Sequence, residues 1–224
     1  MINNVNEHIE SRLLRAPIVP LVQSDDVDVA VRITQALIKG GLTVVEVLLR
    51  TEEALHCLAA IRRSCPDAMV GAGTVLGEEQ AMAAIDAGAQ FIVSPGLNES
   101  VIAVAKAHDA PVFPGIATAT EAQRAWNLGL KSVKVFPAGI AGGPALMKAL
   151  SSVFREMKFM PTGGVSTKNL ADYLAIPSVF ACAGSWLTPA DTVASGKLGK
   201  ISKLAIEAVK IARKRHVTGN HLAK

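Results

Sequence analysis

Short apolar runs alternate with amphipathic helical stretches along almost the whole chain, and no linker interrupts the pattern. Runs of this kind, rich in β-branched residues, are typical of buried strands in parallel sheets. The sequence predicts eight strands, over residues 17–22, 44–49, 69–72, 91–94, 112–114, 132–136, 158–161 and 179–183. It predicts helices between them at 27–39, 52–63, 78–87, 98–108, 120–128, 142–154 and 167–174, with a leading helix at 3–15 and a last one at 199–214.

Eight strands that are each followed by a helix predict a closed (β/α)8 barrel of the TIM type, here with an extra N-terminal helix. The rival α/β architecture is an open doubly wound sheet, which needs a glycine fingerprint after its first strand. Residues 22–26 read Val-Gln-Ser-Asp-Asp and contain no glycine. We therefore expect one barrel domain over residues 1–224, with a disordered tail at about 216–224.

Composition narrows the class of protein further. The chain has 224 residues and is 50% hydrophobic, enough for a full core, yet no run approaches the ~20 apolar residues of a membrane span. Its beginning has neither a basic leader nor an apolar signal core, so we expect a cytoplasmic protein without membrane attachment. The three cysteines have no metal-ligand spacing, and we expect no metal site.

Nucleic acid is not the expected partner. The net charge is +4, and much of the excess lies in the basic segment 210–215. A helix end also favours cationic side chains, which we prefer as the explanation of this segment. Nine aromatic residues are too few to suggest a platform on which bases stack.

Lys134 is the most informative single residue, because it lies inside the apolar run Ser132-Val133-Lys134-Val135-Phe136. Burial disfavours the charged ammonium, and the neutral amine is a nucleophile toward carbonyl groups. A lysine at a strand end can instead extend its ammonium to water. Active sites of (β/α)8 barrels lie at the C-terminal ends of the strands, which favours a chemical role.

The second predicted strand carries charged residues on one face. Glu46, Leu48 and Arg50 share a face because side chains alternate along a strand. If Val45 and Val47 face the helices, Glu46 points into the barrel and Arg50 lies at its mouth. A buried carboxylate suits proton transfer, although a structural ion pair of Glu46 with an arginine is equally compatible with the sequence.

Small and polar residues follow several other predicted strands. Gly71 and Gly73 let another group approach the backbone closely, Thr74 offers a hydroxyl after them, and Pro95 could line a pocket, although turn geometry explains these signals as well. Two small-residue turns end the seventh and eighth strands, and turns at these positions are a usual phosphate site of such barrels. The phosphate-binding candidates are Gly163, Gly164, Gly184 and Ser185.

These motifs together resemble the 2-keto-3-deoxy-6-phosphogluconate (KDPG) aldolase / 4-hydroxy-2-oxoglutarate aldolase family of class I aldolases. The resemblance runs from about residue 17 to about residue 210. It rests on Glu46 with Arg50, Gly71-Ala-Gly-Thr74-Val-Leu, Ser94-Pro-Gly, Phe113-Pro-Gly, Lys134-Val-Phe-Pro137 and Pro161-Thr-Gly-Gly164.

The resemblance implies a reaction and a set of residue roles. Lys134 is implied as the Schiff-base lysine and Glu46 as the general acid and base, working through a bound water. The substrate residues implied are Arg50, Thr74, Pro95, Phe136 and Thr162, beside the phosphate turns already named. The implied protein is a homotrimer that needs no cofactor or metal and cleaves KDPG to pyruvate and glyceraldehyde 3-phosphate, with 4-hydroxy-2-oxoglutarate as a further substrate.

Three alternatives stay open at this point. A close relative cleaves the galactonate epimer and usually has valine where this chain has Thr162, which favours the gluconate substrate. A phosphosugar epimerase could share the barrel and the phosphate turns but would not need Lys134. A non-catalytic barrel that binds a phosphorylated ligand would tolerate the loss of Lys134 or Glu46, and both are present.

Overall fold

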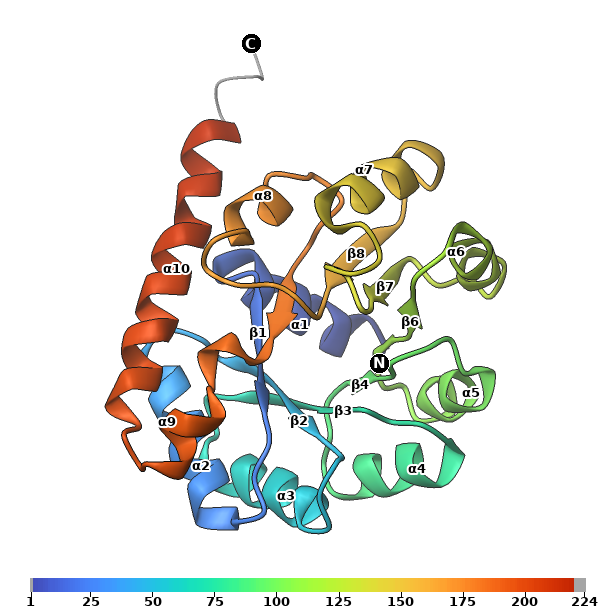
Figure 1. Ribbon diagram of the computed structural model, residues 1–224. Helices are drawn as coiled ribbons and strands as arrows, with labels where there is room; N and C mark the ends of the chain where they lie inside the picture. Colours follow the sequence, from blue (N-terminus) through green and yellow to red (C-terminus); the bar gives the residue numbers. More distant parts are fainter. Residues whose placement is uncertain (1, 220–224) are drawn as a thin grey trace.

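Parallel strands form the centre of the protein and helices surround them, as the computed structural model of residues 2–219 shows (Figure 1). The strands are β1 (Ile18–Val22), β2 (Val44–Leu48), β3 (Met69–Gly73), β4 (Ile92–Val93), β5 (Val112–Phe113), β6 (Gly115–Ile116), β7 (Ser132–Val135), β8 (Lys158–Pro161) and β9 (Cys182–Gly184). The helices are α1 (Ile2–Arg15), α2 (Val27–Lys39), α3 (Ala54–Ser64), α4 (Glu78–Asp86), α5 (Glu99–Ala107), α6 (Ala119–Asn127), α7 (Gly143–Val153), α8 (Leu170–Leu174), α9 (Ala190–Ala194) and α10 (Gly199–Gly219), with a short 3-10 helix η1 (Ser185–Leu187).

Hydrogen bonding closes the barrel. One sheet has the order β5-β4-β3-β2-β1-β9 and the other the order β6-β7-β8, with parallel pairing throughout. Strand β6 continues β5 after a single residue, Pro114. A bridge from Phe159 to Val179 joins β8 to the segment before β9, and a bridge from Thr162 to Ala183 joins the residue after β8 to β9 itself. The predicted (β/α)8 barrel with an N-terminal extra helix is confirmed.

The fifth strand differs from the prediction of one strand over 112–114. Pro114 interrupts it because proline has no backbone N–H to donate, although its carbonyl accepts from the Lys134 backbone N–H at 2.9 Å. The next residue, Gly115, lies against the backbone of Pro95, where a β-carbon would overlap that peptide. The strand therefore appears as β5 and β6, and it still occupies one position in the barrel.

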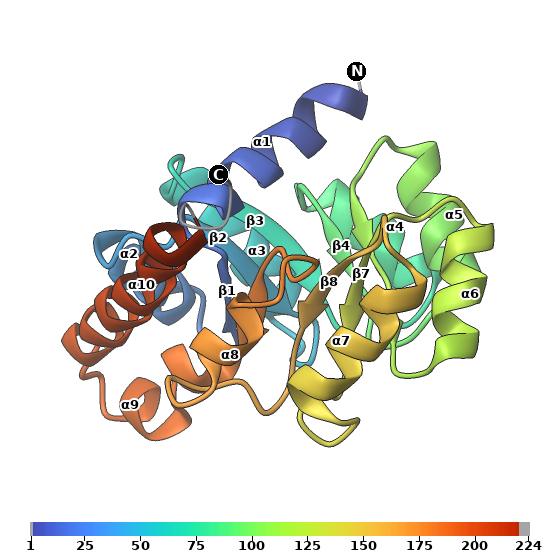
Figure 2. The same cartoon turned by 90° about the horizontal axis from the view of Figure 1, so that it is seen from above.

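Alternating side chains divide the core into two parts. Val45 and Val47 belong to the large cluster between the strands and the helices, whereas Val44 and Leu48 belong to a second cluster inside the barrel. Ile9 and Leu13 of α1 pack into this inner cluster, so α1 closes one end of the barrel. Figure 2 shows α1 at the end opposite α9. The expected orientation of Val45 and Val47 toward the helices is confirmed.

Local signals fix many of the helix ends. Asp26 and Asn98 cap α2 and α5 by accepting backbone N–H groups, and α6 begins with a capping box of Thr118 and Glu121. Burial acts to raise the pKa of Glu121, but hydrogen bonds from Ala117 and Thr118 outweigh it, and the net pKa is lowered.

Two stretches differ from the expected elements. The helix predicted over 167–174 begins only at Leu170, and η1 and α9, which fill the connection after β9, were not expected from the sequence. The strand predicted over 179–183 contributes a bridge at Val179 and continuous pairing only from Cys182. Of the expected tail at 216–224, helix α10 reaches Gly219, and residues 220–224 lie outside the described part of the chain.

Candidate active site

Lys134 of β7 and Glu46 of β2 meet inside the barrel. The Lys134 Nζ donates to Glu46 Oε1 at 3.4 Å, and the two side chains are 5% and 0% exposed. Glu46 and Lys134 are 88 positions apart in the sequence, so only the closure of the barrel brings them together. The second carboxylate oxygen of Glu46 has no hydrogen-bond partner among the described residues. An ion pair so deeply buried usually costs stability, which makes a chemical role the better explanation of its presence.

Two glycines of β3 make room beside this pair. A β-carbon at Gly71 would overlap the ring of Phe91, and a β-carbon at Gly73 would overlap the Glu46 carboxylate. The sequence indicated a close approach to these glycines, and the structure identifies the two groups that make it.

Arg50 and Thr74 lie together at the mouth of the barrel. The Arg50 Nε donates to Thr74 Oγ1 at 3.0 Å, and Arg50 is exposed. Thr74 has a φ of 60°, which is unfavourable for a β-branched residue and is found mainly where surrounding structure enforces it at functional sites. Arg50 uses only its Nε to contact Thr74, which leaves both terminal nitrogens of the guanidinium available for a carboxylate.

Phe136 connects Lys134 to the turn after β8. Its ring centroid lies 5.5 Å from the Lys134 Nζ, and its ring atoms Cδ2 and Cε2 would lie 3.4 Å from a β-carbon at Gly163. Gly163 and Gly164 have φ angles of 84° and 81°, which side chains rarely tolerate. The turn is held from behind, because the Asn169 side-chain amide donates to the Gly164 carbonyl at 2.8 Å.

The second small-residue turn lies beside the first. The bridge from Thr162 to Ala183 aligns the ends of β8 and β9, so Gly163 and Gly184 follow neighbouring positions. Gly184 is buried against the Trp186 ring, and Ser185 is exposed as the first residue of η1. The two turns and their backbone N–H groups thus adjoin one another at the same end of the barrel as Arg50.

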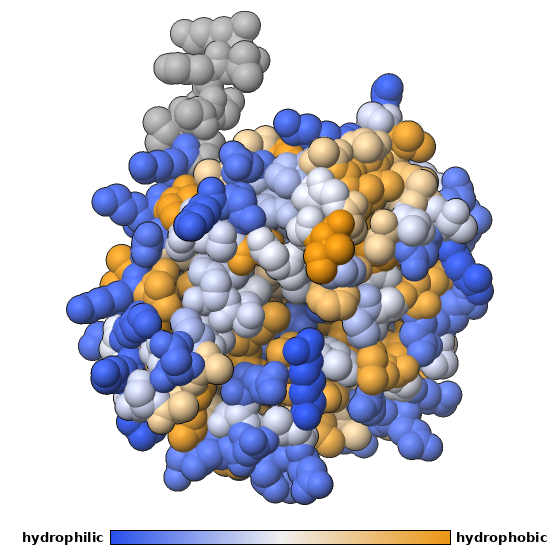
Figure 3. Space-filling model, viewed as in Figure 1, coloured by the Kyte–Doolittle hydropathy of each residue, from blue (hydrophilic) through white to orange (hydrophobic). Residues whose placement is uncertain are grey.

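Thr162 and Pro95 border the same interior. Thr162 is 2% exposed, and its hydroxyl donates to the Met160 carbonyl at 3.3 Å. Pro95 contacts Gly115, and Gly115 is the register partner of Lys134. The predicted site residues therefore come from the C-terminal ends of β2, β3, β4, β7, β8 and β9. Figure 3, from the side of Figure 1, shows polar and apolar side chains mixed on this face, with the most hydrophilic ones mainly toward its edge.

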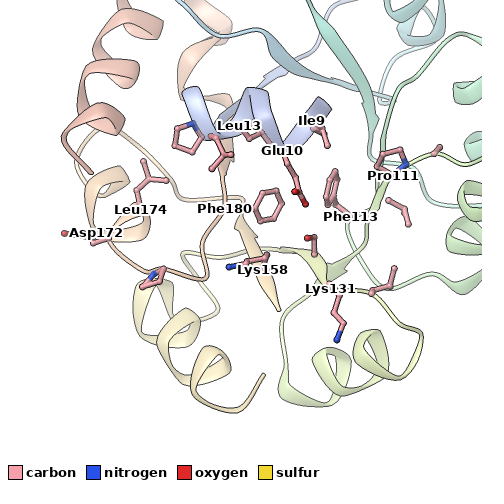
Figure 4. A pocket seen from close by; sticks show the side chains of 18 of the residues that line it. Ile9, Glu10, Leu13, Pro111, Phe113, Lys131, Lys158, Asp172, Leu174 and Phe180 are labelled. Atoms are coloured by element: carbon pink, nitrogen blue, oxygen red, sulfur yellow. The ribbon is translucent and has the colours of Figure 1, made fainter. Parts of the chain in front are cut away.

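A cavity of about 1750 Å³ lies at the opposite end of the barrel and contains neither Lys134 nor Glu46. Figure 4 shows Glu10 of α1 reaching toward Phe113 and Phe180 in this cavity. Its lining is largely apolar and includes Ile9 and Leu13, which also belong to the inner core. Size alone would place the site here, but the buried ion pair, the strained threonine and the glycine turns all lie at the other end.

Within residues 2–219, no group of three or more histidine, cysteine or acidic side chains could hold a metal ion. None of the helices described is long and apolar enough to cross a membrane. The three cysteines are buried, and burial raises the pKa of the Cys57 and Cys65 thiols, with nearby carboxylates adding to the effect. Thiols of this kind are poor nucleophiles.

The fold and the site define a (β/α)8 barrel with a buried lysine–carboxylate pair at the C-terminal ends of its strands. A family profile described as KDPG and KHG aldolase matches residues 9–204. The chain is 46% identical over 199 residues to 2-dehydro-3-deoxy-phosphogluconate aldolase of Treponema pallidum, covering 89% of this chain and 95% of that protein. It is 44% identical over 204 residues to KHG/KDPG aldolase of Escherichia coli, covering 91% and 96%.

A solved structure of the same family is also similar to this chain. A crystal structure of KDPG aldolase from Legionella pneumophila, with pyruvate captured as a covalent carbinolamine, aligns with a TM-score of 0.85 and 33% identity over 89% of this chain and 97% of that one. This chain belongs to the KDPG and KHG aldolase family. It is an aldolase, a lyase that acts on carbon–carbon bonds.

Proposed function

We propose that the protein is a class I aldolase that cleaves KDPG to pyruvate and glyceraldehyde 3-phosphate and also acts on 4-hydroxy-2-oxoglutarate. The observation that carries this proposal is the contact of 3.4 Å between the buried Lys134 amine and the fully buried Glu46 carboxylate. A Schiff-base aldolase needs an amine shielded from water and an adjacent group that exchanges protons. The names of the curated relatives support the same substrates.

The reaction begins at the substrate ketone. Once the Lys134 ammonium has lost its proton, the free amine attacks C2, and a proton passes from the attacking nitrogen to the ketone oxygen, which gives a carbinolamine. Uptake of a further proton expels that oxygen as water and leaves a protonated imine between Lys134 and C2, and this proton is released again when the imine is hydrolysed at the end of the cycle. The imine accepts electrons more readily than the ketone, so covalent catalysis divides one difficult cleavage into easier steps.

Glu46 then moves protons at the neighbouring carbons. Directly or through water, its carboxylate removes the proton of the C4 hydroxyl, the C3–C4 bond breaks, and its electrons pass into the imine to form an enamine. Glyceraldehyde 3-phosphate leaves with a new carbonyl at the former C4. Glu46 returns the proton to C3, and water releases pyruvate and the free amine. The unpartnered Oε2 of Glu46 leaves one oxygen available for that proton or water.

The remaining residues hold the two ends of the substrate. Arg50 and Thr74 bind its carboxylate, beside Pro95, Phe136 and Thr162. The backbone of the two turns, with the Ser185 hydroxyl, binds the phosphate at the other end. Fixing both ends aligns the C3–C4 bond with the imine, and such positioning lowers the barrier by removing the entropy cost of alignment.

The gluconate epimer is the preferred substrate in this proposal, because Thr162 occupies the position where the galactonate-cleaving relative usually has valine. We further propose a cytoplasmic homotrimer that needs no cofactor and no metal ion, as the family resemblance implies. Light scattering coupled to size-exclusion chromatography should give the mass of three chains, whereas a monomer mass would remove the trimer from the proposal.

The test is pyruvate release from KDPG and from its galactonate epimer, with a chelator and without added cofactor. Lys134→Arg keeps the positive charge but removes the nucleophile, and should abolish release. Lys131→Arg is the matched control on the same segment, because Lys131 is exposed and pairs with Glu156 at 2.8 Å. Full activity of Lys134→Arg, or no activity of the unmodified protein on either epimer, would contradict the proposal.

A further inference from the structure

Gly73 occupies an unusual position in β3. A β-carbon built there would overlap Oε1, Cδ and Cγ of the Glu46 side chain. The register explains the contact, because Glu46 pairs with Gly71 and Leu48 pairs with Gly73 in the adjacent parallel strand. The Glu46 side chain therefore extends past its own register partner, Gly71, toward the mouth of the barrel. It covers the α-carbon of Gly73, two residues further along β3.

The backbone does not require glycine at this residue. Gly73 is absent from the glycines with positive φ, and it lies in regular strand pairing. An alanine would fit this conformation, and replacing a glycine with alanine at such a position normally favours the folded state slightly. The need for glycine at position 73 comes from the space that the carboxylate fills.

The carboxylate has little freedom to move elsewhere. At Gly71, next to Gly73 on the same face of β3, the ring of Phe91 fills the equivalent space. The Gly73 backbone itself is fixed, because its carbonyl accepts from the Leu49 N–H at 2.8 Å. A side chain at position 73 would therefore displace Glu46 relative to Lys134, since neither β3 nor Phe91 offers a way to relax.

We propose that Gly73 is a positioning residue for the reaction. The space left by its missing side chain, which we call the seat, holds the Glu46 carboxylate against the Lys134 amine. This inference rests on the proposed roles of Glu46 and Lys134. It extends them by assigning a function in catalysis to a residue that contacts no substrate atom in the proposed mechanism.

The first test is the kinetics of Gly73→Ala. A misplacement of a catalytic group by about 1 Å can cost about 100-fold in rate, and we expect a fall of kcat of about that size. Because the carboxylate and phosphate groups of the substrate are held by other residues, we expect KM to stay within about threefold. Gly77→Ala is the matched control, because a β-carbon there meets no atom within 4 Å, and it should retain activity within about twofold.

The second test is independent of activity. In the Glu46→Ala background the seat is empty, so Gly73→Ala should no longer lower the urea midpoint of unfolding, although it lowers the midpoint of the unmodified protein. Equal midpoint losses in both backgrounds would overturn the inference, as would an unchanged kcat of Gly73→Ala or a loss confined to KM. If the unmodified protein cleaves neither substrate, the proposed function fails, while the difference between the midpoint losses in the two backgrounds still decides whether the seat exists.

Discussion

Replacing Glu46 with glutamine keeps the shape of the side chain but removes its ability to take up a proton. The side chain is 0% exposed, and no second carboxylate and no histidine contacts Lys134 among the residues that the structure describes. No other group there can assume the role, so the loss should lie well within the range of about 10²- to 10⁴-fold that positioned acids and bases contribute. We expect kcat to fall about 10³-fold, which corresponds to about 4 kcal/mol in the barrier.

The assay couples pyruvate release to lactate dehydrogenase and follows NADH, over a range of KDPG concentrations. KM should change little, because Arg50 and the phosphate turns are intact. Glu53→Gln is the matched control, since Glu53 is a partly exposed carboxylate that pairs with His56 on the surface at 3.0 Å. A Glu46→Gln enzyme with normal kcat and a raised KM would show that Glu46 is a structural or binding residue and does not transfer protons.

Three further changes have defined outcomes. Arg50→Lys loses the planar fork that can bind Thr74 and a carboxylate together, so KM should rise about tenfold or more in the same assay while kcat falls less. Glu121→Gln should cost about 1 kcal/mol of unfolding free energy in urea at neutral pH. Since the folded-state pKa of Glu121 is lowered, its contribution is complete above the unfolded-state pKa and is lost as pH falls through the folded-state pKa, so the two proteins should converge in acid. Phe159→Ala, at a fully buried residue, should cost about 3–5 kcal/mol in urea unfolding, and a cost below about 1 kcal/mol would contradict its place in the core.

Sequence periodicity was sufficient for the barrel because each strand is buried on both faces and each helix has one apolar side. Within β2, the alternation of side chains along a strand correctly placed Val45 and Val47 toward the helices and Glu46 toward the interior. It could not show the break at Pro114, because the pairing there depends on which neighbouring strand uses each backbone group. It also missed η1 and α9, whose short sequences carry no clear apolar period.

At the site, the sequence indicated which residues are chemically unusual but left their contacts open. A lysine in an apolar strand is visible without a structure, whereas its distance from Glu46 depends on the curvature of the closed barrel. The positive φ of Thr74 could not be predicted from the sequence, because threonine normally avoids this conformation. The two glycines of β3 signalled a close approach, but the partner of Gly73 became identifiable only from the three-dimensional arrangement of β2 and β3.

The proposed function depends above all on a covalent bond between the Lys134 amine and the keto acid. Reduction with borohydride in the presence of pyruvate, followed by peptide mass spectrometry, tests it most directly. We predict a stable reduced pyruvate adduct on the peptide that contains Lys134 and loss of that adduct in Lys134→Arg. An adduct on another lysine, or no adduct in a protein that still releases pyruvate from KDPG, would contradict the account.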